Sequence, residues 1–210
     1  MFEDEELLIA DEVFYRGAQF TGADVSGSSA ELAEFERCQF TDVDLSKVSL
    51  DRAVLADCVF DRCNLANLKA TGSTLRRVTF GPARMTGLHW AGGGLRETSF
   101  TECRLDLATF RFSAFAHVTF DRCNLAGADF TGADLRGARF TACDLTGAQF
   151  AQAKMEGAVL ERCLLDGVGS VASLRGAILD GPDLVALAHT LAAALGIVVR
   201  KPKDPESSRT

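Results

Sequence analysis

Cysteine, histidine and aspartate supply most of the reactive and metal-binding side chains of this sequence. The cysteines are spaced by multiples of five residues: Cys38, Cys58, Cys63, Cys103, Cys123, Cys143 and Cys163. Their number is odd and none forms a CxxC pair, so neither a disulfide framework nor a zinc site is indicated. We expect buried thiols, because free cysteine behaves as a small apolar residue. The alternative is an adventitious bond between stacked neighbours such as Cys103 and Cys123.

No group of residues matches a known catalytic motif. His89, His117 and His189 are scattered, and P-loop, dinucleotide-binding, HExxH and nucleophile-elbow patterns are all absent. We therefore expect a protein that is not an enzyme and that holds no metal and no cofactor. A binding surface is the function that remains.

Aspartates are the candidates for that surface, because the chain has a net charge of −7. The predicted contact residues are Asp24, Asp42, Asp44, Asp57, Asp61, Asp129, Asp134, Asp144 and Asp166. The charge is banded: residues 15–66 hold nine acids and five bases, whereas residues 67–120 hold three acids and seven bases. Acidic proteins bind nucleic acid poorly, so we expect a protein partner. The alternative is that these aspartates only bind corner amides and keep the chain soluble.

The compartment follows from what the sequence lacks. No apolar run reaches the roughly 18 residues of a membrane span, and the acidic N-terminus is unlike a secretory signal. We expect a cytoplasmic protein with no membrane contact.

A five-residue period in the apolar residues organises the chain. Every fifth residue from Tyr15 to Leu165 is apolar, 31 positions in all, and the residue two places earlier is mostly small. A period of five fits neither an α-helix nor an open strand, but it fits a short extended side followed by a corner. Both series are predicted to point inward and the other three residues of each unit toward solvent.

This pattern resembles a known repeat family. The segments Ala128-Asp129-Phe130-Thr131-Gly132 and Ala133-Asp134-Leu135-Arg136-Gly137 resemble the A(D/N)LXX consensus of pentapeptide-repeat proteins. The resemblance implies an all-β solenoid, a right-handed quadrilateral β-helix of about eight coils. Phenylalanines at every fourth unit support a four-sided coil independently: Phe20, Phe40, Phe60, Phe80, Phe100, Phe120 and Phe140. We expect these residues to form a ladder in the core.

The sequence divides into four parts. Residues 1–14 are an acidic N-terminal extension, either a solvated continuation of the first coil or a contact arm, and residues 15–179 are the β-helix. Residues 180–199 are predicted to form a helix that begins near Pro182 and ends at Gly196, followed by a short strand. Residues 200–210 are predicted to be a disordered tail.

The end of the chain carries a second resemblance. The segment from Leu174 to Val199 is similar to the C-terminal module of the gyrase-protecting pentapeptide-repeat proteins, the Qnr quinolone-resistance proteins and mycobacterial MfpA. That resemblance implies a homodimer held by an apolar stripe and strand: Leu184, Leu187, Leu191, Leu195, Ile197, Val198 and Val199. The unbroken five-residue phase is closer to MfpA, which lacks the loops of Gram-negative Qnr proteins.

The function implied by this resemblance is DNA mimicry. Such a protein binds DNA gyrase or topoisomerase IV and protects it from fluoroquinolones or natural topoisomerase poisons. Residues 15–173 hold 19 acids and 17 bases, so any mimicry of DNA charge must be local. The alternative is a pentapeptide-repeat scaffold or regulatory interaction protein with a partner other than a topoisomerase.

Overall fold

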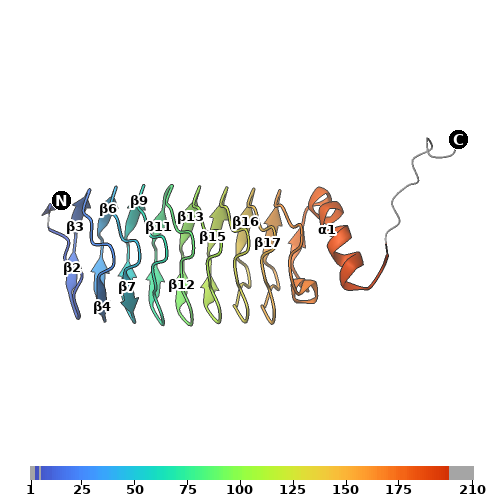
Figure 1. The fold of residues 1–210 in the computed structure, drawn as a ribbon, viewed down its shortest axis with the longest axis horizontal. Coiled ribbons are helices and arrows are strands. Elements are labelled where there is room, and N and C mark those ends of the chain that lie inside the picture. The colour runs from blue at the N-terminus through green and yellow to red at the C-terminus, as the bar shows by residue number, and fades with distance from the viewer. Residues whose placement is uncertain (1–2, 5, 199–210) are drawn as a thin grey trace, which may run out of the picture.

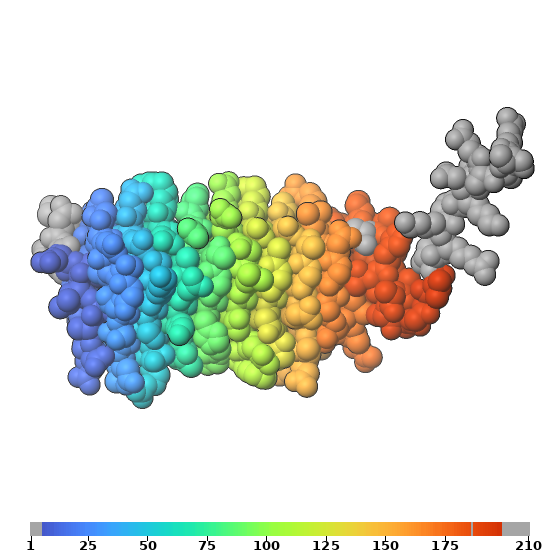
Figure 2. Space-filling view, in the orientation of Figure 1, coloured from blue at the N-terminus to red at the C-terminus, as the bar shows by residue number. Residues whose placement is uncertain are grey.

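The computed structural model describes residues 3–4 and 6–198, which form one elongated rod with a helix at its C-terminal end (Figure 1). Successive coils stack along the rod, whose width is nearly even until it narrows at the C-terminal end (Figure 2). No helix among the described residues is long and apolar enough to span a membrane.

Parallel strands form three ladders on the sides of the rod. The first contains β1 (Glu3–Asp4), β3 (Ala18–Thr21), β6 (Gln39–Thr41), β9 (Val59–Asp61), β11 (Thr79–Phe80), β13 (Ser99–Thr101), β15 (Thr119–Asp121), β16 (Arg139–Thr141), β17 (Val159–Glu161) and β18 (Ile178–Leu179). The second contains β2 (Phe14–Arg16), β5 (Glu34–Glu36), β8 (Val54–Ala56), β10 (Thr74–Arg76), β12 (Gly94–Arg96) and β14 (Ala114–Ala116). The third pairs β4 (Ser29–Glu31) with β7 (Ser49–Asp51). Elsewhere the sides are held by isolated parallel bridges.

Residues that pair between adjacent coils are separated by one full turn of four units. Phe40 pairs with Phe60 in this way, and Leu75 pairs with Leu95. We name the four faces by their first inward apolar residue: the Tyr15 face, the Phe20 face, the Val25 face and the Ala30 face. Each face then recurs once in every coil. The predicted right-handed quadrilateral β-helix is confirmed.

The core contains the two predicted inward series. Phe40 and Phe60 stack with ring centroids 4.3 Å apart, and Phe80 and Phe100 stack at 4.9 Å. A second ladder on the Ala30 face stacks Phe110 on Phe130 at 5.3 Å. Offset-stacked aromatic pairs add to the free energy gained from burial alone. The interior of the described coils is therefore filled largely by stacked side chains.

All seven cysteines are buried and free, as predicted. They occupy the small inward position, and each thiol lies against backbone carbonyls; Cys58 Sγ, for example, is 3.3 Å from the carbonyl oxygens of Phe35 and Ala56. The role of these cysteines is therefore structural, because each thiol packs as a small core residue and makes a weak hydrogen bond.

The corners of the coils have a backbone conformation with a positive φ, which favours glycine. The last residue of most five-residue units has a positive φ, including non-glycine residues such as Leu107 (58°) and Phe112 (57°). Many corners are turns closed by a hydrogen bond, as from Ala108 N to Leu105 O at 3.0 Å. Such turns favour glycine at their third residue.

The C-terminal end departs from the five-residue period after Leu165. A 3₁₀ turn, η1 (Val171–Leu174), follows the last regular corner, and β18 pairs with β17 one position short of the regular register, with Leu160 opposite Leu179. Helix α1 (Gly181–Ala194) then covers the last coil (Figure 1). Buried Asp183 connects α1 to the last coil, because its carboxylate accepts a hydrogen bond from Cys163 N at 3.2 Å.

Two predictions about this end are wrong. Leu184, Leu187, Leu191 and Leu195 do not form one exposed stripe, because Leu187 is buried against the coil and Leu191 is half-buried beside it. The predicted strand does not form at Ile197 and Val198, and Val199 lies outside the described residues. Gly196 has a φ of +71° and Ile197 N donates to Ala192 O at 2.8 Å, so the chain folds back in a Schellman cap.

The N-terminal extension covers the first coil. Strand β1 pairs with β3, and Leu7 and Ile9 are buried. The Tyr15 hydroxyl accepts a hydrogen bond from Leu8 N at 3.0 Å and tethers this segment. The described part of residues 1–14 thus continues the first coil, and it is also an apolar cap that shields the edge of the solenoid.

Candidate partner-binding surface

The nine predicted contact aspartates all lie at outward positions, but they are divided among the faces. Asp24, Asp44, Asp144 and Asp166 lie on the Val25 face. The others lie on the remaining three faces or at corners beside them: Asp42, Asp57, Asp61, Asp129 and Asp134. The structure therefore does not bring the nine side chains together into one patch.

Several aspartates cap the corners of their own coil. Asp24, Asp44 and Asp144 accept hydrogen bonds from the backbone N–H two residues later, at 2.9, 2.8 and 2.9 Å. Asp129 does the same for Thr131 N, at 2.8 Å. This local bond is what Asp and Asn favour in turns. It explains why the repeat places Asp or Asn before the central apolar residue.

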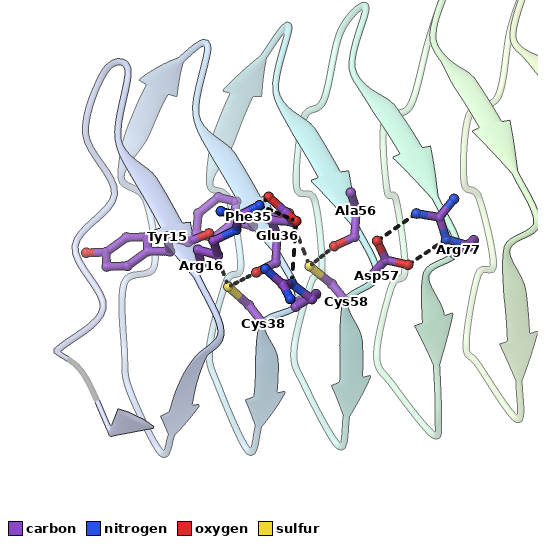
Figure 3. Close-up of polar contacts among 10 residues, drawn as sticks. Tyr15, Arg16, Phe35, Glu36, Cys38, Ala56, Asp57, Cys58 and Arg77 are labelled. Atoms are coloured by element: carbon purple, nitrogen blue, oxygen red, sulfur yellow. Dashed lines mark hydrogen bonds and ion pairs between the residues drawn. The ribbon is translucent and has the colours of Figure 1, made fainter. Parts of the chain in front are cut away.

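Five of the nine aspartates form ion pairs with arginine, and the most regular pairs join residues one coil apart. Arg62 Nε lies 2.9 Å from Asp42 Oδ1, and Arg62 also contacts Asp61. Arg77 Nε lies 2.6 Å from Asp57 Oδ1, which Figure 3 shows beside the pair of Arg16 and Glu36. The remaining pairs are Asp129 with Arg111 at 3.7 Å and Asp134 with Arg136 at 2.6 Å.

These arginines lower the pKa of their partners and weaken the field of each carboxylate at a distance. The hydrogen bond from Arg62 lowers the pKa of Asp42, and the bond from Arg77 lowers the pKa of Asp57. The carboxylates stay ionised, but each adjacent guanidinium cancels much of their field at a distance. These pairs were not predicted from the sequence. The coil of four units explains them, because it places Asp42 next to Arg62 and Asp57 next to Arg77 in adjacent coils.

The four predicted contact aspartates that form no ion pair with a described residue share the Val25 face. Their column of bridges reads Asp24, Asp44, Asn64, Arg84, Arg104, Asn124, Asp144 and Leu164 along the rod. Burial by itself would raise the pKa of Asp44. Hydrogen bonds from Ser46 and Asn64 and the charge of Arg84 outweigh this and lower the pKa. This column is therefore acidic at both ends and basic in its middle, where Asp106 on the same face follows Arg104 by two residues.

The predicted dimerisation residues fall into two groups. Leu187 and Leu191 pack on the rod, whereas Leu184, Leu195, Ile197 and Val198 are exposed, with exposed fractions from 53% to 86%. Val185, which the sequence analysis did not select, is 73% exposed. The end of the molecule thus presents an apolar surface that does not consist of the predicted stripe.

Other reactive side chains do not gather. His89 and His117 are surface residues on different faces, and no cluster of three or more His, Cys, Asp or Glu suited to a metal occurs among the described residues. Trp90 is buried as predicted, in the core of the Ala30 face, and its indole N–H has no partner there.

Family membership rests on the repeat itself. The family model described as "Pentapeptide repeat region" matches residues 33–110 and 95–169, more than half of the chain. The chain belongs to the pentapeptide-repeat family. No curated protein matches the sequence of this pentapeptide-repeat protein.

Solved pentapeptide-repeat structures are similar to it at low identity. HetL, involved in heterocyst differentiation regulation in Nostoc sp. strain PCC 7120, is 18% identical over 80% of this chain and 90% of its own, with a TM-score of 0.31. QnrB1, a plasmid-mediated fluoroquinolone resistance protein, in a trypsin-treated form is 23% identical over 91% and 100%, with a TM-score of 0.34. Rfr23 of the cyanobacterium Cyanothece 51142 is 14% identical over 77% and 91%, with a TM-score of 0.28. These similarities concern the fold alone.

Proposed function

We propose that this pentapeptide-repeat protein is a binding protein and not an enzyme, and that its partner is a type II topoisomerase, DNA gyrase or topoisomerase IV. Bound as a homodimer in place of DNA, it protects the enzyme from fluoroquinolones or natural topoisomerase poisons. The proposal follows the sequence resemblance to the Qnr and MfpA group, and the geometry limits which residues can carry it.

The observation that supports it best is the Val25 face. Asp24, Asp44, Asp144 and Asp166 lie on one side of a straight rod, outside any ion pair of the described residues. Duplex DNA carries one negative charge per about 1.7 Å of axis, far more than this face supplies. The mimicry is therefore local, with carboxylates near each end of the rod meeting basic positions of the enzyme.

Dimerisation is proposed to occur through the exposed residues of the C-terminal end. Leu184, Val185, Leu195, Ile197 and Val198 expose apolar side chains close together in sequence. Clusters of this kind mark interaction sites. A two-fold pairing of these surfaces, in which each contributes the same residues, doubles the rod and places an acidic stretch of the Val25 face in each arm.

Aspartate-to-asparagine substitution tests the proposal. Asp24, Asp44, Asp144 and Asp166 are replaced together by Asn, which keeps the oxygen that caps the corners at the first three positions and removes four charges. The variant is expected to lose protection in a gyrase supercoiling assay with a fluoroquinolone, and binding by the parent is expected to weaken as salt rises. The matched control replaces ion-paired Asp42, Asp57, Asp61 and Asp134, and its loss should be smaller. A parent protein that does not bind either enzyme contradicts the proposal.

A specific observation favours a second candidate function. Arginine neutralises five of the nine predicted contact aspartates, and the middle of the Val25 face is basic. A scaffold or regulatory protein with a partner other than a topoisomerase needs no acidic surface. Unchanged protection by both quadruple variants, with binding that does not respond to salt, favours this candidate.

A further inference from the structure

A belt of positive charge crosses the middle of this acidic rod. Residues 67–86, one complete coil, contain Lys69, Arg76, Arg77 and Arg84 and no acid. On the Val25 face, Arg84 and Arg104 lie directly opposite one another in a parallel bridge. Both side chains are exposed, and neither forms an ion pair with a described residue. Like charges directly opposite in a sheet are destabilising, so the fold gives no reason for this pair.

Exposed apolar residues occupy two corners of the coil that carries Arg104. Leu107 is 66% exposed and Phe112 is 62% exposed, at the two ends of one side of the Ala30 face. Both are the third residue of a hydrogen-bonded turn and have a positive φ. Bulky residues rarely adopt this conformation, and the same corners carry Gly87 and Gly92 in the preceding coil. Neither burial nor backbone conformation explains the choice of Leu and Phe.

The following coil leaves room for these two side chains. A Cβ at Gly127 would lie 3.0 Å from Leu107 Cδ2, and a Cβ at Gly132 would collide with the Phe112 ring. Arg111 lies over the same ring, with its guanidinium carbon 5.8 Å from the ring centroid. Phenylalanine and arginine are both enriched in protein interfaces relative to the rest of the surface.

We propose that Arg84, Arg104, Leu107 and Phe112 form a mid-rod patch that docks a short acidic segment of a partner protein, one that also carries apolar side chains. The guanidinium groups bind its carboxylates, and Leu107 and Phe112 receive its apolar residues. Along the column of bridges, Asp44 and Asp144 bound the basic stretch, five coils or roughly 24 Å apart. Asp106 lies between Arg104 and Leu107, and its carboxylate accepts a hydrogen bond from Thr86 Oγ1 at 3.0 Å. A long polyanion such as nucleic acid would run over all three carboxylates, whereas a short peptide segment meets only Asp106. The proposal does not depend on a topoisomerase as partner.

Charge is tested first, by fluorescence anisotropy at low salt with labelled peptides of equal length. One peptide contains Glu and Leu, a second Glu and Ser, and a third Lys and Leu; a single-stranded oligothymidylate is the polyanion probe. The parent is expected to bind the Glu and Leu peptide most tightly. Arg84→Gln with Arg104→Gln should weaken this binding about tenfold. The control, Arg76→Gln with Arg139→Gln, removes two exposed bases from other faces and should leave it unchanged.

The apolar corners are tested separately, with a variant that the fold should accept. Leu107→Gly with Phe112→Gly places glycine where φ is positive, so the melting temperature should hold or rise while binding of the Glu and Leu peptide falls to that of the Glu and Ser peptide. The control, Leu32→Gly, alters another exposed leucine with a φ of 58° and should leave binding unchanged. The proposal is overturned if the parent does not bind the Glu and Leu peptide, if it prefers oligothymidylate, or if the double glycine variant binds normally or melts at a lower temperature.

Discussion

A carboxylate contributes to the field outside the rod only when no cation lies beside it. Asp57 and Arg77 are one coil apart and form two short hydrogen bonds, whereas Asp44 bonds to Ser46 N and to the neutral amide of Asn64. Both aspartates are outward, Asp44 directly before a central apolar residue and Asp57 at a corner with a φ of 57°. Their neighbours one coil away give Asp44 the greater effect on an approaching partner.

The pair of Asp57 and Arg77 gives a pH-dependent prediction. Arg77 lowers the pKa of Asp57, so the pair stabilises the fold above the ordinary pKa of about 3.9 and loses this contribution as pH falls through the lower, folded value. Urea melts across pH should show Arg77→Gln less stable than the parent at neutral pH and nearly equal to it in strong acid. Arg139→Gln, which breaks no ion pair of the described residues, is the control. A deficit for Arg77→Gln that does not change with pH contradicts the assignment.

The aromatic ladder gives the largest predicted stability effect of a single residue. Phe80 stacks between Phe60 and Phe100, at centroid distances of 4.8 and 4.9 Å, and is fully buried. Phe80→Ala removes one rung and should cost roughly 3–5 kcal/mol in the free energy of unfolding. Cys123→Ala alters an equally buried but much smaller side chain and should cost about 1 kcal/mol. Denaturant melts that reverse this order would refute the two inward series.

At the scale of elements, helix α1 has one face on the rod and another exposed. Leu187 is buried against the last coil, and Asp183 binds the backbone of that coil. Leu184 in the first turn and Leu195 at the C-cap are exposed. The helix therefore closes the solenoid through one set of residues and is free to bind a second copy through another.

This division gives a prediction about assembly. Leu184→Asp with Leu195→Asp should yield a monomer by light scattering with the melting temperature of the parent, because both positions are exposed. Leu187→Asp should lower the melting temperature, since it buries a charge between helix and coil. If the parent is already monomeric at micromolar concentration, or if the double variant stays dimeric, the proposed dimer surface is wrong.

The sequence predicts the regular part of the molecule better than its end. The five-residue period makes Phe80 and Cys123 inward with no further information, because each coil repeats the environment of the last. The orientation of α1 depends on the 3₁₀ turn at Val171–Leu174 and on the contact of Asp183 with Cys163 N, which no periodicity encodes. The missing strand has a similar cause, since Ile197 would need a neighbouring strand to pair with and instead caps the helix.

At the scale of the whole molecule, the unit of construction is the coil of four repeats. Each coil bonds only to the coils on either side, so the stability of the rod is approximately a sum over coils and their interfaces. Removing one complete coil should leave a shorter rod with intact ladders. The position of the deletion matters, because the side chains that come into contact must match in size.

Residues 99–118 are the best choice for such a deletion. Their removal stacks Phe80 on Phe120, Trp90 on Phe130 and Leu95 on Leu135, so every large inward residue keeps a large neighbour. We expect a cooperatively folded rod, shorter by about 4.8 Å in small-angle scattering and less stable by the contribution of one coil. Deletion of 99–120 also removes Thr119 and Phe120, leaves the next coil too short to keep its phase, and should abolish cooperative melting. If both deletions fold equally well, the coil of four repeats is not the unit that sets the register of this rod.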